Sequence, residues 1–346
     1  MLKYVLKRFG YMLMVVMILT LLMYSVYNLI PNDRAATAAR AEITANKNMS
    51  LDYDVLYARY QRFYGTDGNL VTRYLRWMGF VPFSAVDEGD EPVYKGLIQG
   101  NLGTSYEQNK PVLEVLKEPM KNTIFINIFA TFAALGITIP LGIFCAVKKG
   151  SKRDTAVQVG TIVGYSLPSF VIAILFIWVF VSLLGWFPAG GMSTTGADYT
   201  GLRAFGDRMY HLALPLIVMT FTSLGGMTRY VRAAMIDALS MDCVRTARAK
   251  GVREKVVIYS HAWRNALIPV VTLVVGWFIG IFGGSLMIEN IFSLNGVGRV
   301  YNQSLMKADF EVVLALQMFY VIISLLGNLV IDLVYGLVDP RIRVNS

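Results

Sequence analysis

Six apolar runs, each long enough to cross a lipid bilayer as a helix, constrain this chain more than any other feature. A helix needs about 20 residues to cross the hydrocarbon core. Hydrocarbon offers no hydrogen-bond partners, so each span must satisfy its own backbone groups, which selects helices. The runs cover about residues 9–30, 122–147, 155–184, 209–228, 265–288 and 312–337. They predict an all-α membrane protein with six transmembrane helices.

Composition and charge agree with a membrane location. The chain has 346 residues, of which 55% are hydrophobic and only 16% charged, whereas soluble domains carry about 25% charged residues. A net charge of +9 could indicate nucleic-acid binding, but the basic residues gather beside the apolar runs. The clusters are Lys3, Lys7 and Arg8; Lys148, Lys149, Lys152 and Arg153; the stretch 229–264; and Arg341 with Arg343. Six spans place all four clusters on one side.

The positive-inside rule assigns that side to the cytoplasm, so we expect both termini to be cytoplasmic. The predicted organisation is an N-terminal transmembrane helix at 1–30, an extracytoplasmic loop domain at 31–120, and a core of five transmembrane helices at 121–346. The first run is about 22 residues long, which exceeds the 7–15 apolar residues of a secretory signal and favours a retained helix.

The loop domain contains a stripe of tyrosines at helical spacing. The stripe consists of Tyr53, Tyr57, Tyr60 and Tyr64. It is either a docking surface for an outside partner or the packing face of a short helix, and apolar faces at helical period favour packing. Further short helices are expected at 74–78 and 94–98.

Few polar residues lie inside the spans. The amides Asn127, Gln158, Gln317 and Asn328 could line a polar translocation path or bond between helices, and both interpretations stay open. Pro140 should bend the second span. Glycines four residues apart, at 160/164 and at 276/280/284, predict close packing of spans. Buried acidic or histidine relays, which ion-driven carriers need, are scarce.

No energy source or reactive centre is evident in the chain. A phosphate-binding loop needs G-x-x-x-x-G-K-[ST], and the dipeptide Gly-Lys does not occur. Cys145 and Cys243, with His211 and His261, have no metal-site spacing. We therefore expect no catalytic residue, no metal and no cofactor in this chain, so that work must enter from outside it.

The basic stretch 242–269 is the candidate entry point, within a loop at 231–264 between the fourth and fifth spans. Residues 229–239 should continue the fourth span, and Asp242 can cap a following helix. Spacings of three and seven place Arg245, Arg248 and Lys255 on one helical face; Val244, Ala247 and Gly251 share another, and Gly251 predicts a helix end. This loop either only sets orientation or forms a docking helix that transmits motion, and the spacing leaves both open.

A family resemblance bears on that choice. The stretch YVRAAMIDALSMDCVRTARAKG, followed by HAWRNALIPVVT, resembles the loop signature of ATP-binding-cassette (ABC) importer permeases in its oligopeptide/dipeptide form. Further segments resemble the B-type subunit of that family: LKRFGYMLMVVMILTLLMYSVYNLIP, KGLIQGNLGTSYEQNKPVLEVLKEPMKNT, GWFPAGG, IENIFSLNGVGRVYNQSL and LVIDLVYGLVDPRIR. Only about 31–90 lacks a match.

The resemblance implies a cytoplasmic coupling helix between the fourth and fifth spans. Its residues are Asp242, Arg245, Thr246, Ala247, Arg248, Ala249, Lys250 and Gly251. Arg245 and Thr246 replace the Glu-Ala of the general motif, and Cys243 replaces an aromatic residue. The implied partners are a second, homologous permease subunit, two cytoplasmic ATPases that bind ATP and Mg, an outside solute-binding protein, a peptide substrate, and the lipids of a bacterial or archaeal cytoplasmic membrane.

Two alternatives stay open at this point. The same importer class includes permeases for nickel, opines or oligosaccharides. A protein of another class, a membrane-anchored scaffold or sensor that uses 31–118 as its receptor region, would need no ATPase.

Overall fold

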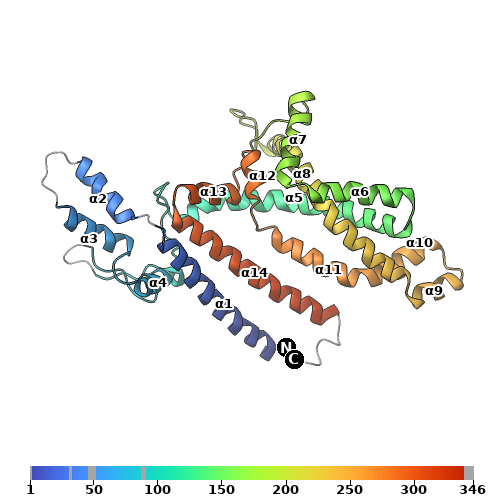
Figure 1. Cartoon of the computed structure of the whole chain (residues 1–346), viewed down its shortest axis with the longest axis horizontal. Coiled ribbons are helices and arrows are strands. Elements are labelled where there is room, and N and C mark those ends of the chain that lie inside the picture. Colours follow the sequence, from blue (N-terminus) through green and yellow to red (C-terminus); the bar gives the residue numbers. More distant parts are fainter. Residues whose placement is uncertain (1, 31–32, 46–51, 87–90, 339–346) are drawn as a thin grey trace. The chain divides into compact units, whose positions relative to one another are not determined.

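The computed structural model describes residues 2–30, 33–45, 52–86 and 91–338, and over these residues it is helical without a named strand. The helices, in chain order, are α1 (Leu2–Asn28), α2 (Arg34–Ala45), α3 (Tyr53–Tyr64), α4 (Leu70–Met78), η1 (Leu97–Gln99), α5 (Val112–Val147), α6 (Lys152–Ser166), α7 (Ser169–Phe176), η2 (Ile177–Leu183), α8 (Gly201–Leu239), α9 (Asp242–Ala249), α10 (Glu254–Val256), η3 (Val257–Ala262), α11 (Trp263–Gly280), α12 (Leu286–Ile291), α13 (Val297–Met306) and α14 (Phe310–Val338) (Figure 1).

The chain forms two compact units, each described here by itself. Unit 1 combines Met1–Leu116 with Gln303–Val321, and unit 2 combines Lys117–Asn302 with the chain from Ile322 onward. The predicted division at 30 and 120 stays a prediction. The basic pair at 341 and 343, parts of the unmatched 31–90 region and the end of the last matched segment lie outside the described residues.

Among the described residues, five helical segments are long and apolar enough to cross a membrane, and a sixth results if one bent pair counts as a single span. The five are α1, α5, α8, the continuous α10–η3–α11 and α14. The bent pair is α6 with α7–η2, which meet at an angle of 103°. An all-α membrane fold is confirmed, with five or six candidate spans.

The third predicted span, 155–184, is wrong as one continuous helix. Pro168 has no N–H to continue the hydrogen-bond ladder, and its ring disfavours helical geometry in the preceding residue. Leu167 accordingly has φ −84° and ψ 136°, an extended conformation. The helix ends at Ser166 and a new one begins at Ser169.

The fifth predicted span, 265–288, is displaced toward the N-terminus. The continuous helical segment begins at Glu254 and ends at Gly280. Asn127, on α5, donates from Nδ2 to the carbonyls of Ile281 at 2.8 Å and Gly283 at 2.7 Å. These carbonyls follow the helix end and would otherwise lack partners in an apolar setting. The amide therefore stabilises the end of α11.

In unit 1, α2 and α3 lie side by side (Figure 1). The tyrosine stripe of α3 faces α2: Tyr60 donates to Glu42 at 2.7 Å, and Tyr57 donates to Asp33 at 2.6 Å. These two contacts fit the packing interpretation of the stripe, and the choice between packing and docking stays a prediction. The helix expected at 74–78 is confirmed within α4, whereas the one expected at 94–98 is wrong, because only the three residues of η1 are helical there.

A buried arginine organises the part of unit 1 around α4. Arg76 is only 4% exposed, and its guanidinium forms a bidentate pair with Asp67 at 2.7 and 3.2 Å. It also donates to the carbonyls of Gly65 and Pro82. One side chain thus ties together the turn before α4 and the chain after it. A buried charge is tolerated only when it is paired in this way.

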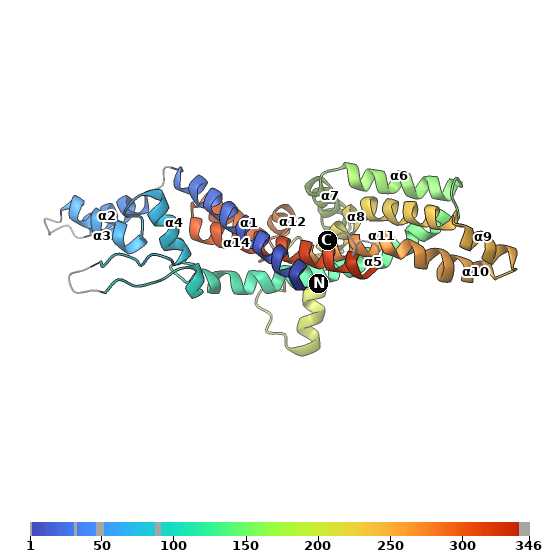
Figure 2. The same ribbon diagram turned by 90° about the horizontal axis from the view of Figure 1, so that it is seen from below.

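Unit 2 has a basic end, which carries α9, and an opposite end. At the opposite end, Glu289 on α12 accepts hydrogen bonds from the Thr123 hydroxyl at 3.0 Å and from the backbone N–H of Arg299 at 2.9 Å, which ties α12 to α5 and to the start of α13. Burial raises the pKa of the Glu289 carboxyl, and these hydrogen bonds oppose that rise. At the other end, α6 lies alongside α8 (Figure 2).

We predict that Arg76→Met destabilises the part of unit 1 around α4 by about 3–5 kcal/mol, because it leaves the Asp67 carboxylate without its charged partner and three carbonyls, those of Gly65, Asp67 and Pro82, without this donor. The measurement is amide hydrogen exchange of residues 53–86 in the full-length protein in detergent. Arg62→Met, which removes an exposed arginine of α3, is the matched control. Equal exchange in the two variants would contradict the assigned role.

Candidate functional site

The basic loop is built on a long extension of α8. This helix runs without interruption to Leu239, so the expected continuation of the fourth span over 229–239 is confirmed. After Ser240 and Met241 the chain enters α9, and η3 then leads it directly into α11. The eight-residue α9 is therefore held between two long candidate spans.

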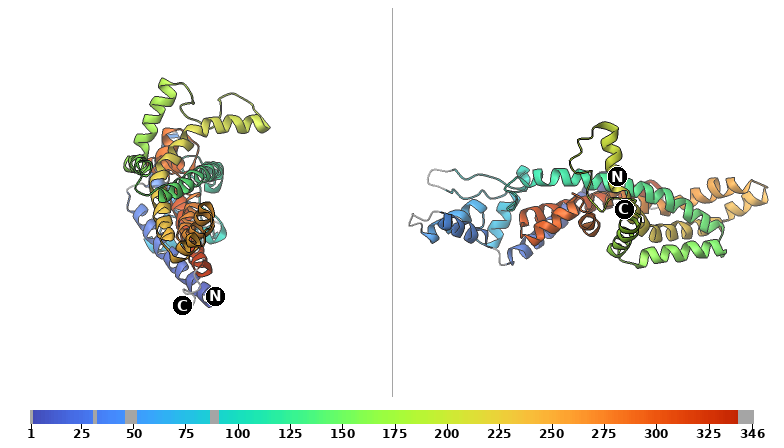
Figure 3. Two further views of the ribbon diagram at one scale, coloured as in Figure 1. Left: turned by 90° about the vertical axis from the view of Figure 1, so that its right-hand side faces the viewer. Right: turned by 90° about the horizontal axis from the view of Figure 1, so that it is seen from above.

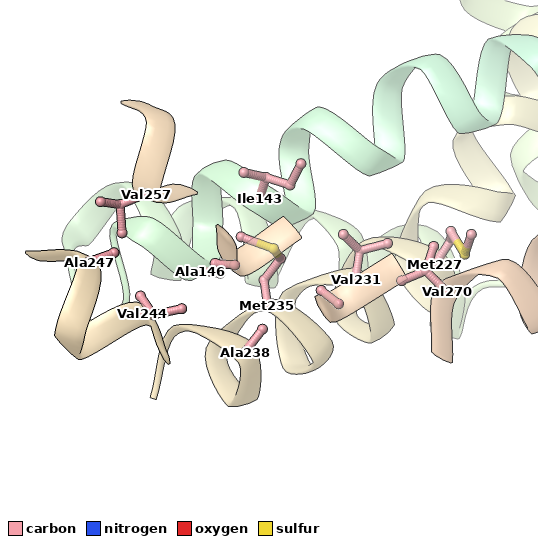
Figure 4. Packing of buried hydrophobic residues seen from close by; sticks show 12 residues of the cluster. Ile143, Ala146, Met227, Val231, Met235, Ala238, Val244, Ala247, Val257 and Val270 are labelled. Atoms are coloured by element: carbon pink, nitrogen blue, oxygen red, sulfur yellow. The ribbon is translucent and has the colours of Figure 1, made fainter. Parts of the chain in front are cut away.

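The inner face of α9 belongs to a buried core. Val244 is fully buried and Ala247 is 6% exposed. They pack with Met235 and Ala238 of α8 and with Val257 of η3 (Figure 4). The other buried members of this cluster are Ile143 and Ala146 of α5, Met227 and Val231 of α8, Ala262 of η3, and Ala266 and Val270 of α11. Burying a valine side chain contributes about 1.5–3 kcal/mol, so this short helix is fixed by tertiary packing.

A glycine ends α9 in a Schellman arrangement. Gly251 has φ +73°, which favours glycine. Its N–H donates to the carbonyl of Arg248 at 3.0 Å, and the N–H of Val252 donates to the carbonyl of Ala247 at 3.2 Å. Val252 packs against the same core as Ala247. The helix end expected at Gly251 is confirmed.

Two expectations about this helix are wrong. Asp242 does not cap α9: it is the first helical residue, the cap position is Met241, and no side chain caps the helix. Its carboxylate still sits in the first turn, where the helix dipole favours negative charge. Lys255 does not share a face with Arg245 and Arg248, because the chain turns at Gly251 and Lys255 lies on the separate α10.

The outer face of α9 is bare within the described chain. The exposed residues of α9 and of the turn that ends it are Asp242, Cys243, Arg245, Thr246, Arg248, Ala249, Lys250 and Gly251. The side chain of Arg245 is 71% exposed and that of Asp242 is 95% exposed, so their 3.6 Å pair is weak. Arg248 and Glu254 form a 2.7 Å pair that links α9 to α10. Of the implied coupling residues, only Ala247 faces inward.

A buried ion pair that sequence reasoning missed braces the helix that carries this loop. Asp154, 1% exposed near the start of α6, accepts two hydrogen bonds of 2.8 Å from Arg232 on α8. It also accepts from the N–H of Gly150 and the amide of Gln158, both at 2.9 Å. In the sequence, the one sign of this pair is a single acidic residue directly after the basic residues at 148–153. Its partner lies 78 positions away, so the sequence does not reveal the pairing.

Two of the four amides considered for a path make hydrogen bonds to other helices or helix ends: Asn127 binds the end of α11, and Gln317 donates to Tyr27 at 2.8 Å within unit 1. Gln158 donates to Asp154 one turn earlier in the same helix, α6. Asn328 on α14 is exposed. The bonds of Asn127 and Gln317 fit the alternative of contacts between helices, and a role in lining a path stays a prediction. No group of three or more potential metal ligands occurs among the described residues.

These features define a class: a multi-pass α-helical membrane protein whose basic loop carries a short helix, packed on its inner face and bare on its outer face. The family model described as "Binding-protein-dependent transport system inner membrane component" matches residues 138–344, and the chain belongs to this family. The resemblance to ABC-importer permeases is confirmed. The chain is a permease subunit that works with other components of such an importer, a transport component rather than an enzyme.

Several relatives match over most of their length. The chain is 34% identical to the oligopeptide transport system permease protein AppB of Bacillus subtilis (strain 168), over 81% of this chain and 83% of that protein. It is 33% identical to a putative peptide permease protein of Brucella ovis, over 99% and 100%. It is 31% identical to the dipeptide transport system permease protein DppB of Alkalihalophilus pseudofirmus, also over 99% and 100%.

A solved structure supports the fold. A chain in the inward-facing structures of the MetNI methionine ABC transporter superposes with a TM-score of 0.50 at 16% identity, covering 64% of this chain and 97% of that one. At this identity the likeness extends to the fold alone.

We predict that Asp154→Asn loosens the basic end of unit 2, because Arg232 loses its carboxylate partner while it remains largely buried. Breaking such a pair costs about 3 kcal/mol or more. In a Cys243→Ser background, maleimide labelling of the buried Cys145 should then become about 100-fold faster, since about 1.4 kcal/mol corresponds to a factor of ten.

The control is Lys152→Gln, which removes an exposed charge from the same helix end. An Asp154→Leu, Arg232→Met double variant should recover most of the protection, because replacing both partners removes the unpaired charge. Unchanged labelling in Asp154→Asn would show that the pair does not brace these helices.

Proposed function

We propose that this chain forms half of the translocation path of an ABC importer for di- and oligopeptides, and that the bare face of α9 is where a cytoplasmic ATPase docks. A second, similar permease subunit forms the other half. Two ATPases bind ATP and Mg, and a solute-binding protein delivers cargo from outside. This chain itself contributes no cofactor and no catalytic group.

The observation that carries the proposal is the contrast between the two faces of α9. Val244 and Ala247 are buried in a core that includes residues of α8, η3 and α11, whereas the basic outer face has no covering element among the described residues. An element built this way is rigidly attached to two spans and accessible to a partner. The ABC class supplies the partner, an ATPase.

The proposed mechanism follows from that attachment. When the ATPases close around ATP they displace α9, and the shared core carries the displacement to α8 and α11 together. Packed cores respond as rigid bodies rather than by continuous deformation. The ion pair between Asp154 and Arg232 joins α6 to α8, so that α6 would move with them. The access of the path would thus switch between the two sides of the membrane.

The orientation is part of the proposal. Within unit 2, the Asp154–Arg232 pair places the basic cluster at 148–153 beside the basic end of α8. The positive-inside rule then assigns this end, and with it both termini, to the cytoplasm. The helices α2 to α4 would lie outside, where we propose that they help to seat the binding protein.

The peptide cargo rests on the relatives. The three relatives described above carry the words oligopeptide, peptide and dipeptide in their names. A nickel cargo finds no support in the described residues, which hold no metal-ligand cluster. The family match disfavours a stand-alone scaffold or sensor. It covers residues 138–344, which hold most of the predicted transport core, and a scaffold or sensor would not need such a core.

We predict that Gly251→Glu abolishes coupling in the reconstituted complex. Space is open around Gly251, so a glutamate there adds bulk and negative charge to the docking face without a clash inside this chain, at the cost of the strain that φ +73° imposes on any residue with a Cβ. The measurements are ATP hydrolysis stimulated by peptide-loaded binding protein, and peptide uptake into proteoliposomes. We expect both to fall at least tenfold.

The matched control is Gly251→Asn, which also places a Cβ at φ +73° but suits the left-handed region and adds no charge. It should keep most of the activity. If Gly251→Glu retains peptide-stimulated hydrolysis and uptake, α9 is not the docking site.

A further inference from the structure

A polar cavity of about 480 Å³ lies in unit 2, away from the basic loop. It is bounded by the first turns of α8, the chain before α8, the start of α5 and the segment after α12. Figure 3 shows the first turns of α8, in yellow-green, extending beyond the neighbouring helices of unit 2. Small-ligand sites have volumes of roughly 300–1,000 Å³, so the cavity has the size of such a site.

One cation, Arg208, lines this cavity without a carboxylate partner. Its Nη2 donates to the side-chain oxygen of Asn122 at 2.7 Å, and its guanidinium carbon lies 4.2 Å from the centroid of the Phe125 ring. Its Nε is buried and makes no hydrogen bond. Across the described parts of the chain, no acidic side chain forms an ion pair with it. A guanidinium has five N–H donors, so most of its capacity is unused.

The neighbouring carboxylate does not neutralise Arg208. Asp207 accepts hydrogen bonds from the backbone N–H of Thr194 at 2.9 Å and from its hydroxyl at 2.6 Å. Its other close partner is His211, with 3.9 Å between the two side chains. Asp207 is thus engaged in fixing the chain before α8. Glu118 attracts Arg208 electrostatically, but its ion pair is with Lys121 at 2.8 Å, so among the described residues no carboxylate pairs directly with the guanidinium.

Asp207 also lines the cavity, and the remaining polar lining is neutral. Ser193, Ser293, Asn295 and Tyr199 contribute hydroxyl and amide groups. Neutral hydrogen-bonding groups around a forked cation form a site for a planar anion, because the fork of arginine matches the two oxygens of a carboxylate. An unpaired charge near the end of a candidate span is also costly, which favours a functional role.

We propose that this cavity binds the C-terminal carboxylate of the transported peptide through Arg208. The inference rests on the proposed peptide cargo and deepens it. Every unmodified peptide carries this carboxylate whatever its side chains, so Arg208 recognises the class without restricting the sequence. In the proposed orientation the first turns of α8 lie at the outer side, where the binding protein releases its cargo.

The test compares one tripeptide with its C-terminal amide in the reconstituted complex, using the same binding protein throughout. Arg208→Gln should slow uptake of the free acid by at least about tenfold, the loss expected for one charge-assisted hydrogen bond, and should leave the amide within about twofold. The ratio of acid uptake to amide uptake reports the preference of the permease subunit alone, because the same binding protein delivers both peptides to every variant. The acid-to-amide uptake ratio of Arg208→Lys should lie between that of the wild type and that of Arg208→Gln.

Arg203→Gln is the matched control. Arg203 lies on the same helix and covers the ring of Tyr199 at 4.2 Å, but it does not line the cavity. It should keep the wild-type ratio. An unchanged ratio in Arg208→Gln, or an equal loss of acid and amide uptake, overturns the inference.

A second measurement decides the matter if Arg208→Gln does not assemble. Maleimide labelling of Ser193→Cys, in a Cys243→Ser background of the full complex, should be slowed by the tripeptide acid and not by its amide. Protection by inorganic phosphate alone would assign the cavity to phosphate or to a lipid headgroup and overturn the inference. Peptide-stimulated ATP hydrolysis by the unmodified complex tests the proposed function separately.

Discussion

The burial of Val244 and Ala247 in the core shared by α8, η3 and α11 is the interaction on which the rest of this structure depends. An isolated helix of eight residues is unstable in water, because nucleation is costly and few hydrogen bonds follow it. Here α9 exists because two small apolar side chains fill a space between long helices, and because Gly251 closes its end. The same packing frees the basic face for a partner and joins it mechanically to two candidate spans. Loss of this packing would remove both the helix and its connection.

The need to satisfy polar groups away from water explains the remaining architecture. Asn127 binds carbonyls at the end of α11, and Asp154 pairs with Arg232 where α6 meets α8. Glu289 holds the start of α13. Each polar side chain serves a helix end or a junction between helices. Arg208 departs from this pattern, since its Nε is buried without a partner beside a cavity, and this departure is what points to a ligand.

Hydropathy is a local property, so the positions of most spans, the extension of α8 and the turn at Gly251 could be predicted from the sequence. Other features depend on contacts. Pro168 breaks its helix, yet Pro140 and Pro215 lie inside theirs, because the outcome depends on neighbours that satisfy the freed carbonyl. Lys255 does not share the face of Arg245, because a spacing argument assumes one continuous helix, whereas the turn at Gly251 ends α9 before Lys255. The Asp154–Arg232 brace and the Arg208 cavity join residues that are far apart in the sequence, and no periodicity reveals such pairs.

The central claim is that the outer face of α9 lies in the cytoplasm beneath a docked ATPase. Cys243 is a native probe beside that face, since it is an exposed residue of α9 whose Sγ lies 3.9 Å from Nδ2 of Asn265 on α11, whereas Cys145 is buried. The most direct test is labelling of Cys243 by a membrane-impermeant maleimide in oriented vesicles, with and without the ATPase subunits. The account predicts rapid labelling in inside-out vesicles, none in right-side-out vesicles, and strong protection by the ATPases. Labelling from the outside, or labelling that the ATPases do not slow, would contradict it.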